Sequence, residues 1–399
     1  MHSKSMLLFD DWAGIPVCVL LSCWHYISFP LRQLKKFTRR IPSSPSRIAV
    51  IKFLGMGSII LISPMMRQLR AVYPSARIVF VTFSSNRRIV ELLNIADEVL
   101  SVRTDNFMLF VWDTLALLVK LRARRIEMVL DCEFFAKYSV MVSYLSGARI
   151  RAGYYVRELW RKKLLTHHAF YNHFKHAQDN FGMLLRTLGV DFRPVEVLEP
   201  PRLPVPEMAF KSLKKHALAI AINVNASELI TLEMRRWPKE YFAQLCVDLL
   251  DSCDCELWFV GAPNECPYVE KVIGELCKKR KVPDRIVNWT GKTTIDELAA
   301  LLKASDFVVA NDSGIMHVAA LVGTKVCAVF GAETPLMYSP LGKGHIVFSR
   351  QELYCHPCLH VYNRKQNLCI FPEKYACLRR TTPGQVFRVI KTEWLERKI

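Results

Sequence analysis

The stretch Phe307–Gly331, FVVANDSGIMHVAALVGTKVCAVFG, decides the fold of the second half of the chain. It predicts a short apolar strand, a polar turn, a helix and a second apolar strand. We expect Asn311 or Asp312 to cap the helix, and Gly323 to end it in a left-handed conformation. Two parallel strands with a helix between them form a βαβ unit, which places the turn at the carboxyl edge of a sheet.

A turn of this kind offers backbone N–H groups and a helix N-terminus to an anion such as a diphosphate. The candidate residues at this position are Asp312, Ser313, Gly314 and His317. They are the starting point for a predicted site that binds a nucleotide-linked donor.

Strands and helices alternate on both sides of a proline-rich segment, which predicts an α/β protein with two doubly wound, Rossmann-like domains facing a cleft. Five prolines between Pro194 and Pro206 indicate the linker. Apolar strands are expected over 47–53, 77–83, 98–102 and 126–132, and again over 217–224, 255–261 and 284–288. The expected parts are a membrane-associating segment 1–46, domains 47–193 and 207–350 with the linker 194–206 between them, and a cysteine-containing tail with a C-terminal helix, 351–399.

The chain has 399 residues, 51% of them hydrophobic, and a net charge of +19. This size supports more than one folded core, and this charge favours an anionic partner. The basic residues are scattered and no zinc-finger, RNP-type or basic-zipper pattern occurs, so no nucleic-acid partner is expected. The 13 cysteines lie mostly in apolar runs, as Cys246 and Cys327 do, which predicts reduced, buried thiols in a cytoplasmic protein.

An uncharged stretch, WAGIPVCVLLSCWHYISFPL, lies between Asp11 and Arg32 and precedes the basic run RQLKKFTRR. Its prolines, His25 and two tryptophans make it a poor membrane-spanning helix. One alternative is a helix packed on the protein's own surface. We favour an interfacial membrane anchor whose basic run meets anionic headgroups.

Gly55 and Gly57 follow the first strand and precede a helix, as in a phosphate-binding turn. Ile60 stands where a dinucleotide fingerprint has its third glycine, and the second strand ends without an acid, so a nicotinamide cofactor is not expected. The turn either binds nothing or lets an acceptor sugar approach the backbone.

Ser227 and the pair Arg235–Arg236 lie in the loop after the first strand of the second domain. Arginines near a helix N-terminus can clamp a diphosphate, although an arginine pair is more often a solvated surface feature. Glu265 follows the next strand, where a carboxylate suits the hydroxyls of a ribose. It could equally well start the helix.

Cys355, Cys358, Cys369 and Cys377 form a tail set whose spacing resembles a structural zinc site, except that the second pair is not CxxC. We favour thiols or a locally packed loop, and expect no metal and no cofactor.

These motifs together resemble glycosyltransferase family 9, the ADP-heptose:lipopolysaccharide heptosyltransferases, over about 47–386. The most specific piece is NDSGIMHVAALVGTKVCAVFG, supported by NASELITLEMRRWPKEYFAQL, FVGAPNE and LGMGSIILISPMMRQLRAVYP. The resemblance implies a GT-B fold and an inverting, metal-independent transfer onto inner-core lipopolysaccharide, at the cytoplasmic face of the inner membrane.

The resemblance also assigns residues. Asp312, Gly314 and His317 would hold the diphosphate and sugar of the donor, Ser227, Arg235 and Arg236 would flank the phosphates, Glu265 would bind the ribose, and Lys137 would lie on the acceptor side. The family's first loop reads L-G-D, with the aspartate as general base, whereas this chain has Ser58 there. A neutral serine is a poor base at pH 7, so Glu133, or failing it Asp131, is the predicted base.

The sequence therefore predicts a membrane-associated transferase that uses an ADP-sugar on lipopolysaccharide or another anionic glycolipid. Three alternatives stay open: a transferase for another nucleotide sugar, a non-catalytic nucleotide-sugar-binding protein, and a nucleic-acid binder, which strongly salt-dependent binding would reveal.

Overall fold

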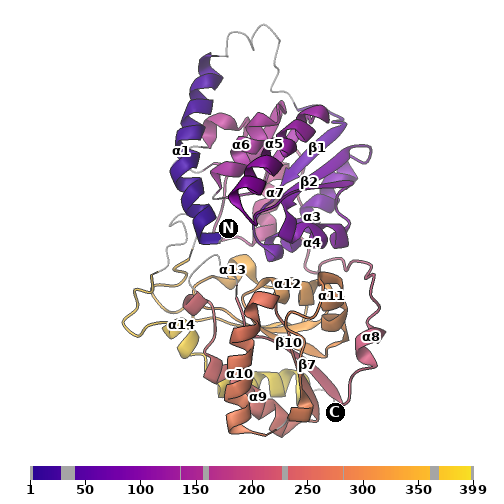
Figure 1. Cartoon of the computed structure of the whole chain (residues 1–399), viewed down its shortest axis with the longest axis vertical. Helices are drawn as coiled ribbons and strands as arrows, with labels where there is room; N and C mark the ends of the chain where they lie inside the picture. The colour runs from indigo at the N-terminus through magenta and orange to yellow at the C-terminus, as the bar shows by residue number, and fades with distance from the viewer. Residues whose placement is uncertain are drawn as a thin grey trace. The chain divides into compact units, whose positions relative to one another are not determined.

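The computed structural model describes residues 3–27, 41–134, 136–155, 161–226, 232–281, 283–359 and 368–396. The chain forms two compact units, Met1–Pro194 and Val195–Ile399 (Figure 1). The boundary lies at the start of the proline-rich segment. The predicted cleft between domains stays a prediction, since each unit is described by itself.

Unit 1 contains a six-stranded sheet in the order β3-β2-β1-β4-β5-β6, and every neighbouring pair is parallel. The strands are β1 (Arg47–Ile51), β2 (Arg77–Phe83), β3 (Glu98–Val102), β4 (Met128–Asp131), β5 (Ile150–Tyr154) and β6 (His167–Ala169). The helices are α1 (Ser3–Ile27), α3 (Met56–Val72), α4 (Arg87–Leu93), α5 (Phe107–Ala123), α6 (Lys137–Leu145) and α7 (Ala177–Arg186). The predicted strands of this half are confirmed, while α5, β5 and β6 were not predicted.

Unit 2 contains a second six-stranded parallel sheet, in the order β12-β11-β10-β7-β8-β9. Its strands are β7 (Leu218–Asn223), β8 (Cys255–Phe259), β9 (Ile286–Asn288), β10 (Phe307–Asn311), β11 (Lys325–Val329) and β12 (Ile346–Phe348). Its helices are α8 (Met208–Lys211), α9 (Lys239–Ser252), α10 (Cys266–Lys279), α11 (Ile295–Ala304), α12 (Gly314–Leu321), α13 (Pro335–Tyr338), α14 (Ala376–Arg379) and α15 (Pro383–Ile390). The predicted fold, two doubly wound parallel sheets, is confirmed.

The opening βαβ unit is present as β10, α12 and β11. Gly323 has φ 84°, so the left-handed end of the helix is confirmed. The predicted cap is wrong: the N-cap of α12 is Ser313, because Asn311 belongs to β10 and Asp312 pairs with Arg235. The Ser313 hydroxyl does not cap the helix either, since it donates to Asn223 Oδ1 at 2.9 Å.

The core of unit 2 includes residues from the C-terminal tail. Leu378, Val386, Ile390 and Trp394 are buried in the same cluster as the strands β7 and β10. The Trp394 ring lies 4.9 Å from the ring of Phe307. The end of the tail therefore completes this unit's core.

The N-terminal helix α1 packs on unit 1 through α6. Asp10 accepts from the backbone N–H groups of Lys137 and Tyr138, at 2.8 and 2.7 Å, and so caps α6. Cys18 is buried beside Val140. Among the residues described, no helix is both long enough and apolar enough to cross a bilayer.

Candidate nucleotide-sugar site at the carboxyl edge of the unit 2 sheet

The unit 2 sheet has its topological switch point between β7 and β10, because the chain order runs outward in opposite directions from this pair. Open α/β sheets bind ligands outside the carboxyl ends of the strands at this point. The polar residues that follow these strands form what we call the β7–β10 site: Asn225, Arg235, Arg236, Glu265, Thr290 and Asp312.

The centre of the site is an ion pair between Arg235 and Asp312, two residues that the sequence predicted as separate donor contacts. Arg235 donates to the Asp312 carboxylate at 2.6 Å and to the Asp312 carbonyl at 2.9 Å. Both side chains are at most 10% exposed. Burial alone would lower the pKa of Arg235, but the carboxylates of Asp312 and Glu333 outweigh it and raise that pKa, so the guanidinium stays charged.

This ion pair gives Asp312 a role within the protein, in addition to the donor contact predicted for it. A carboxylate that already accepts from Arg235 positions the guanidinium, and its own charge repels a diphosphate. The neighbouring Asn311 likewise holds the loop, since its Oδ1 accepts from Trp237 N at 2.9 Å and its Nδ2 donates to Val224 O at 2.9 Å. Asp312 therefore positions Arg235, and its predicted contact with the diphosphate and sugar of the donor stays a prediction.

Arg236 is held on the other side of the loop. It donates to Asn225 Oδ1 at 2.9 Å, and its guanidinium lies 4.1 Å from the centre of the Tyr268 ring in α10. These contacts fix the direction of the cation at the carboxyl end of β7.

A third cluster gathers around Gly261, after β8. A Cβ built on this glycine would lie 2.7 Å from Glu265 Oε2, 3.1 Å from Thr290 Cγ2 and 3.4 Å from Asn225 Nδ2. The loops after β7, β8 and β9 therefore converge here, and a side chain at position 261 would displace the Glu265 carboxylate. Glu265 Oε2 accepts from Ala262 N at 2.7 Å and so closes the short 3-10 turn Pro263–Glu265, which precedes α10. The ribose contact predicted for Glu265 stays a prediction.

Several buried polar atoms of the site lack a partner among the residues that the structure describes. They are Asn225 Nδ2, Arg235 Nε, Arg236 Nε and Thr290 Oγ1. A buried polar atom without a hydrogen bond costs free energy. Four such atoms at one edge of the sheet therefore indicate that a polar ligand binds there. Three of the four are amide or guanidinium N–H donors, which suits phosphate oxygens. Thr290 was not predicted, although a polar residue two positions after the end of β9 was a usable signal.

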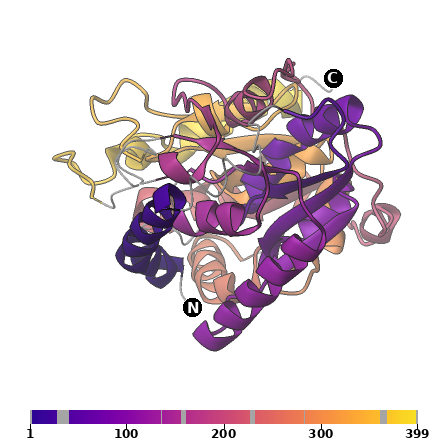
Figure 2. The same ribbon diagram turned by 90° about the horizontal axis from the view of Figure 1, so that it is seen from above.

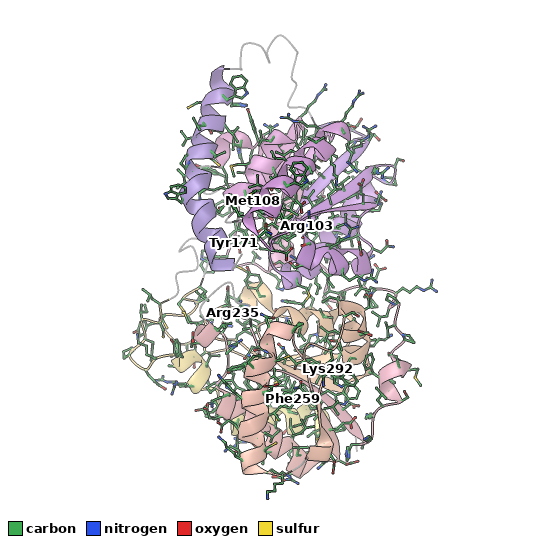
Figure 3. All side chains as sticks on the ribbon, viewed as in Figure 1. Arg103, Met108, Tyr171, Arg235, Phe259 and Lys292 are labelled. Atoms are coloured by element: carbon green, nitrogen blue, oxygen red, sulfur yellow. The ribbon has the colours of Figure 1, made fainter. Side chains whose placement is uncertain are left out.

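The structure gives no further evidence on the donor contacts predicted for Gly314, His317 and Ser227. Gly314 opens α12, and His317 is buried within that helix. Ser227 lies outside the described residues. Arg235 is labelled in Figure 3, which shows the side chains of both units.

In unit 1 the corresponding switch point lies between β1 and β4. Gly55 has φ 84° at the N-cap of α3, so this turn requires glycine. Gly57 and Ser58 lie in the first turn of α3, and Ser58 Oγ would lie 3.3 Å from a Cβ on Gly55.

Glu133 binds this turn tightly. One carboxylate oxygen accepts from the backbone N–H groups of Phe53 and Leu54, at 2.7 and 2.8 Å, and the other accepts from Lys52 Nζ at 2.9 Å. The Lys52 and Glu133 side chains are 4% and 1% exposed. The structure therefore gives Glu133 a bracing role, and its predicted role as general base stays a prediction.

Asp131 is equally enclosed. It accepts from Ser139 Oγ at 3.0 Å and from the guanidinium of Arg161, whose side chain is fully buried. Burial raises the pKa of the Asp131 carboxyl, although the Arg161 charge opposes the shift. Lys137 is also buried, with Nζ 3.8 Å from an Asp10 carboxylate oxygen of α1, and its predicted place on the acceptor side stays a prediction.

The four tail cysteines lie near one another. Burial, together with the neighbouring thiols of Cys358, Cys369 and Cys355, raises the pKa of Cys377 to about 12, and burial raises that of Cys358 to about 11. Both are therefore thiols at neutral pH. Within the described residues, no set of three or more His, Cys, Asp or Glu side chains is arranged to hold a metal ion.

Two Rossmann-like sheets, the second with buried N–H donors at its switch point, are typical of nucleotide-binding proteins. The family model for glycosyltransferase family 9 (heptosyltransferase) matches residues 114–369, more than half of the chain. The chain belongs to glycosyltransferase family 9.

Two solved structures have the same GT-B fold. The family 9 glycosyltransferase from Veillonella parvula aligns with a TM-score of 0.72 and 21% identity, covering 90% of this chain and 100% of that one. The ADP-heptose heptosyltransferase II from Escherichia coli aligns with a TM-score of 0.67 and 20% identity, covering 88% and 100%. The predicted fold class is thereby confirmed.

Among curated proteins, lipooligosaccharide heptosyltransferase 2 from Campylobacter jejuni is 26% identical over 157 residues, 39% of this chain and 46% of that protein. The matched part thus spans about half the length of this relative.

Proposed function

We propose that the protein is an inverting glycosyltransferase that transfers a heptose from ADP-heptose to inner-core lipopolysaccharide or a similar anionic glycolipid. The observation that carries the proposal is the β7–β10 site, with its buried, partnerless N–H donors, in a chain of this family. The relatives' names supply the sugar and acceptor, and the charge of +19 suits a phosphorylated acceptor.

We also place the enzyme at the cytoplasmic face of the inner membrane, with the nucleotide sugar and the glycolipid as partners and no nucleic acid. Trp12, Leu20 and Trp24 of α1 are exposed, while Gly14 and Cys18 on its other side are buried. A helix attached to its domain by one face and apolar on the other supports the interfacial anchor. The basic run predicted to meet the headgroups lies outside the described residues.

A second candidate function is donor binding without transfer. Ser58 cannot act as a carboxylate base, and Asp131 and Glu133 are both enclosed by cations and backbone N–H groups. A base must reach the acceptor hydroxyl to accelerate transfer.

Replacing Ser58 by aspartate tests both candidates. We expect Ser58→Asp to raise the rate of heptosyl transfer from ADP-heptose to a lipid-linked acceptor by about 10²-fold, since a positioned general base contributes at least this factor. The measurement is release of ADP in single-turnover assays, with Ser85→Asp as the control for an added charge. An unchanged rate in Ser58→Asp would contradict the assignment of position 58 as the place of the general base. If neither wild type nor Ser58→Asp transfers heptose, the protein binds the donor without transfer.

A further inference from the structure

The helix α5 exposes an apolar face that the proposed function does not use. Met108, Trp112 and Val119 are 78%, 69% and 68% exposed, and Val111 and Leu115 lie between them in the sequence. Their spacing of three and four residues puts them on one face of the helix. Leu117 and Leu121 are the two buried residues of α5, all of which is described.

The charge around this face is positive. The one acidic residue of α5, Asp113, accepts two hydrogen bonds from the Arg103 side chain, each 2.8 Å long. These bonds hold the pKa of Asp113 at about 2, so its charge is paired at neutral pH. Lys120 and Arg122 occupy the last turn of the helix.

A basic pocket of about 1180 Å³ begins where α5 ends. Four arginines, Arg47, Arg122, Arg125 and Arg149, line it, and Glu127 is the single acid in the lining. Arg47 donates to Arg124 O and Arg122 to Leu145 O, both at 2.8 Å, and these bonds hold two of the guanidinium groups in place. The pocket lies at the amino ends of β1, β4 and β5, the opposite edge of the sheet from the Gly55 turn.

The helices α5 and α1 flank α6 on the same face of the sheet. Tyr138 of α6 packs on Phe110 of α5 with ring centres 5.0 Å apart, while Val140 and Tyr144 of α6 pack beside Cys18 of α1. Figures 1 and 2 show α1 and α5 on either side of α6. The exposed tryptophans of α1 and the apolar face of α5 thus belong to one layer of unit 1.

We propose that the apolar face of α5 and the arginine pocket at its end form a docking surface for an anionic phospholipid membrane. The apolar side chains enter the boundary between headgroups and acyl chains, and the arginines bind lipid phosphates. Such a membrane would cover the exposed apolar face and neutralise the positive charge beside it. This inference deepens the proposed function, which needs access to a lipid-anchored acceptor.

Vesicle binding by the full chain tests it without using turnover. We expect wild-type protein to bind vesicles of phosphatidylglycerol and phosphatidylcholine more strongly than pure phosphatidylcholine, in a salt-dependent manner. Trp112→Ser with Leu115→Ser should weaken binding about tenfold. The matched control is Met208→Ser with Leu213→Ser, which are exposed apolar residues of unit 2, and it should bind like wild type.

The arginine pocket has its own pair of variants. Arg125→Asn with Arg149→Gln should weaken binding to the anionic vesicles about fivefold per arginine and leave binding to phosphatidylcholine unchanged. Asparagine tolerates the left-handed backbone of Arg125, whose φ is 48°. The control for charge is Lys343→Gln with Lys278→Gln in unit 2, two exposed lysines.

Each of the following results would overturn the inference. The first is a failed vesicle test, seen either as equal binding by the α5 variant and its control or as no binding by wild type. The second is a wild-type dimer that Trp112→Ser with Leu115→Ser disperses without lipid, which would assign the face to a second copy of the chain. Another is that inorganic phosphate stabilises the protein against thermal unfolding while no vesicles are bound. This result would make the arginine pocket a site for a free anion and not for a lipid headgroup. Donor binding and transfer in detergent are measured separately, so either proposal can fail alone.

Discussion

Asp312→Ala is expected to destabilise unit 2 by about 3–5 kcal/mol, the effect of removing one partner from a buried ion pair. Arg235 stays charged in this variant, because an arginine side chain does not lose its proton at neutral pH. It also removes the acceptor of the 2.6 Å hydrogen bond in a place where the arginine is at most 10% exposed. The loss exceeds that of any exposed ion pair.

The measurement is urea denaturation followed by hydrogen exchange in peptides from β7 and β10, which reports unit 2 separately from unit 1. Glu196→Ala is the control, because Glu196 and its partner Lys343 are 86% and 83% exposed, and it should change stability by less than about 0.5 kcal/mol. The double variant Asp312→Ala with Arg235→Met should regain part of the loss, since it removes both charges of this ion pair, while the buried Glu333 carboxylate remains. A single variant as stable as the control would show that Asp312 does not position Arg235.

The second large effect is expected from Glu133→Gln in unit 1. The glutamine keeps the size of the side chain, and its one oxygen can still accept from the N–H groups of Phe53 and Leu54. It leaves the buried Lys52 ammonium without a counter-charge, because an amide NH2 group takes the place of the oxygen that accepted from Lys52. We expect a loss of about 3–5 kcal/mol in the stability of unit 1, for the same physical reason as in unit 2.

Adding Lys52→Met to Glu133→Gln distinguishes two roles of Glu133, a structural role in holding the turn after β1 and a catalytic role as general base. If Glu133 acts as a brace, the double variant recovers both stability and transfer, which is the result we expect from the contacts. A double variant that regains stability but not transfer would instead establish Glu133 as the general base. The readouts are hydrogen exchange of the β1 peptide and single-turnover ADP release.

The sequence was sufficient to predict the two parallel sheets because buried parallel strands are short apolar runs flanked by turn residues. The unpredicted helix α5 shows where this reasoning fails. Its sequence, FMLFVWDTLALLVKLRA, has apolar residues on every side and therefore no amphipathic period. The short strands β5 and β6 carry Arg151, His167 and His168, and so lack an apolar run.

The site was predictable to the level of the sheet edge but not to the level of contacts. The sequence pattern placed Arg235 and Asp312 at the same edge of the predicted sheet. It could not show that these two residues pair with each other, because the number of residues between them does not determine their distance in the folded protein. The same limit applies to Glu133, whose partners Lys52, Phe53 and Leu54 come from another strand and its turn.

The most direct test of the account is binding of nucleotide sugars at the β7–β10 site, measured by thermal shift and calorimetry with ADP-, UDP- and GDP-sugars. We predict that wild-type protein binds the ADP-sugar most tightly. Arg236→Ala and Asn225→Ala should each weaken this binding about tenfold or more, since each removes a donor or the residue that orients it. Lys343→Gln, an exposed charge in the same unit, should leave it unchanged. Equal binding of the ADP-sugar by wild type, Arg236→Ala and Asn225→Ala would contradict the account.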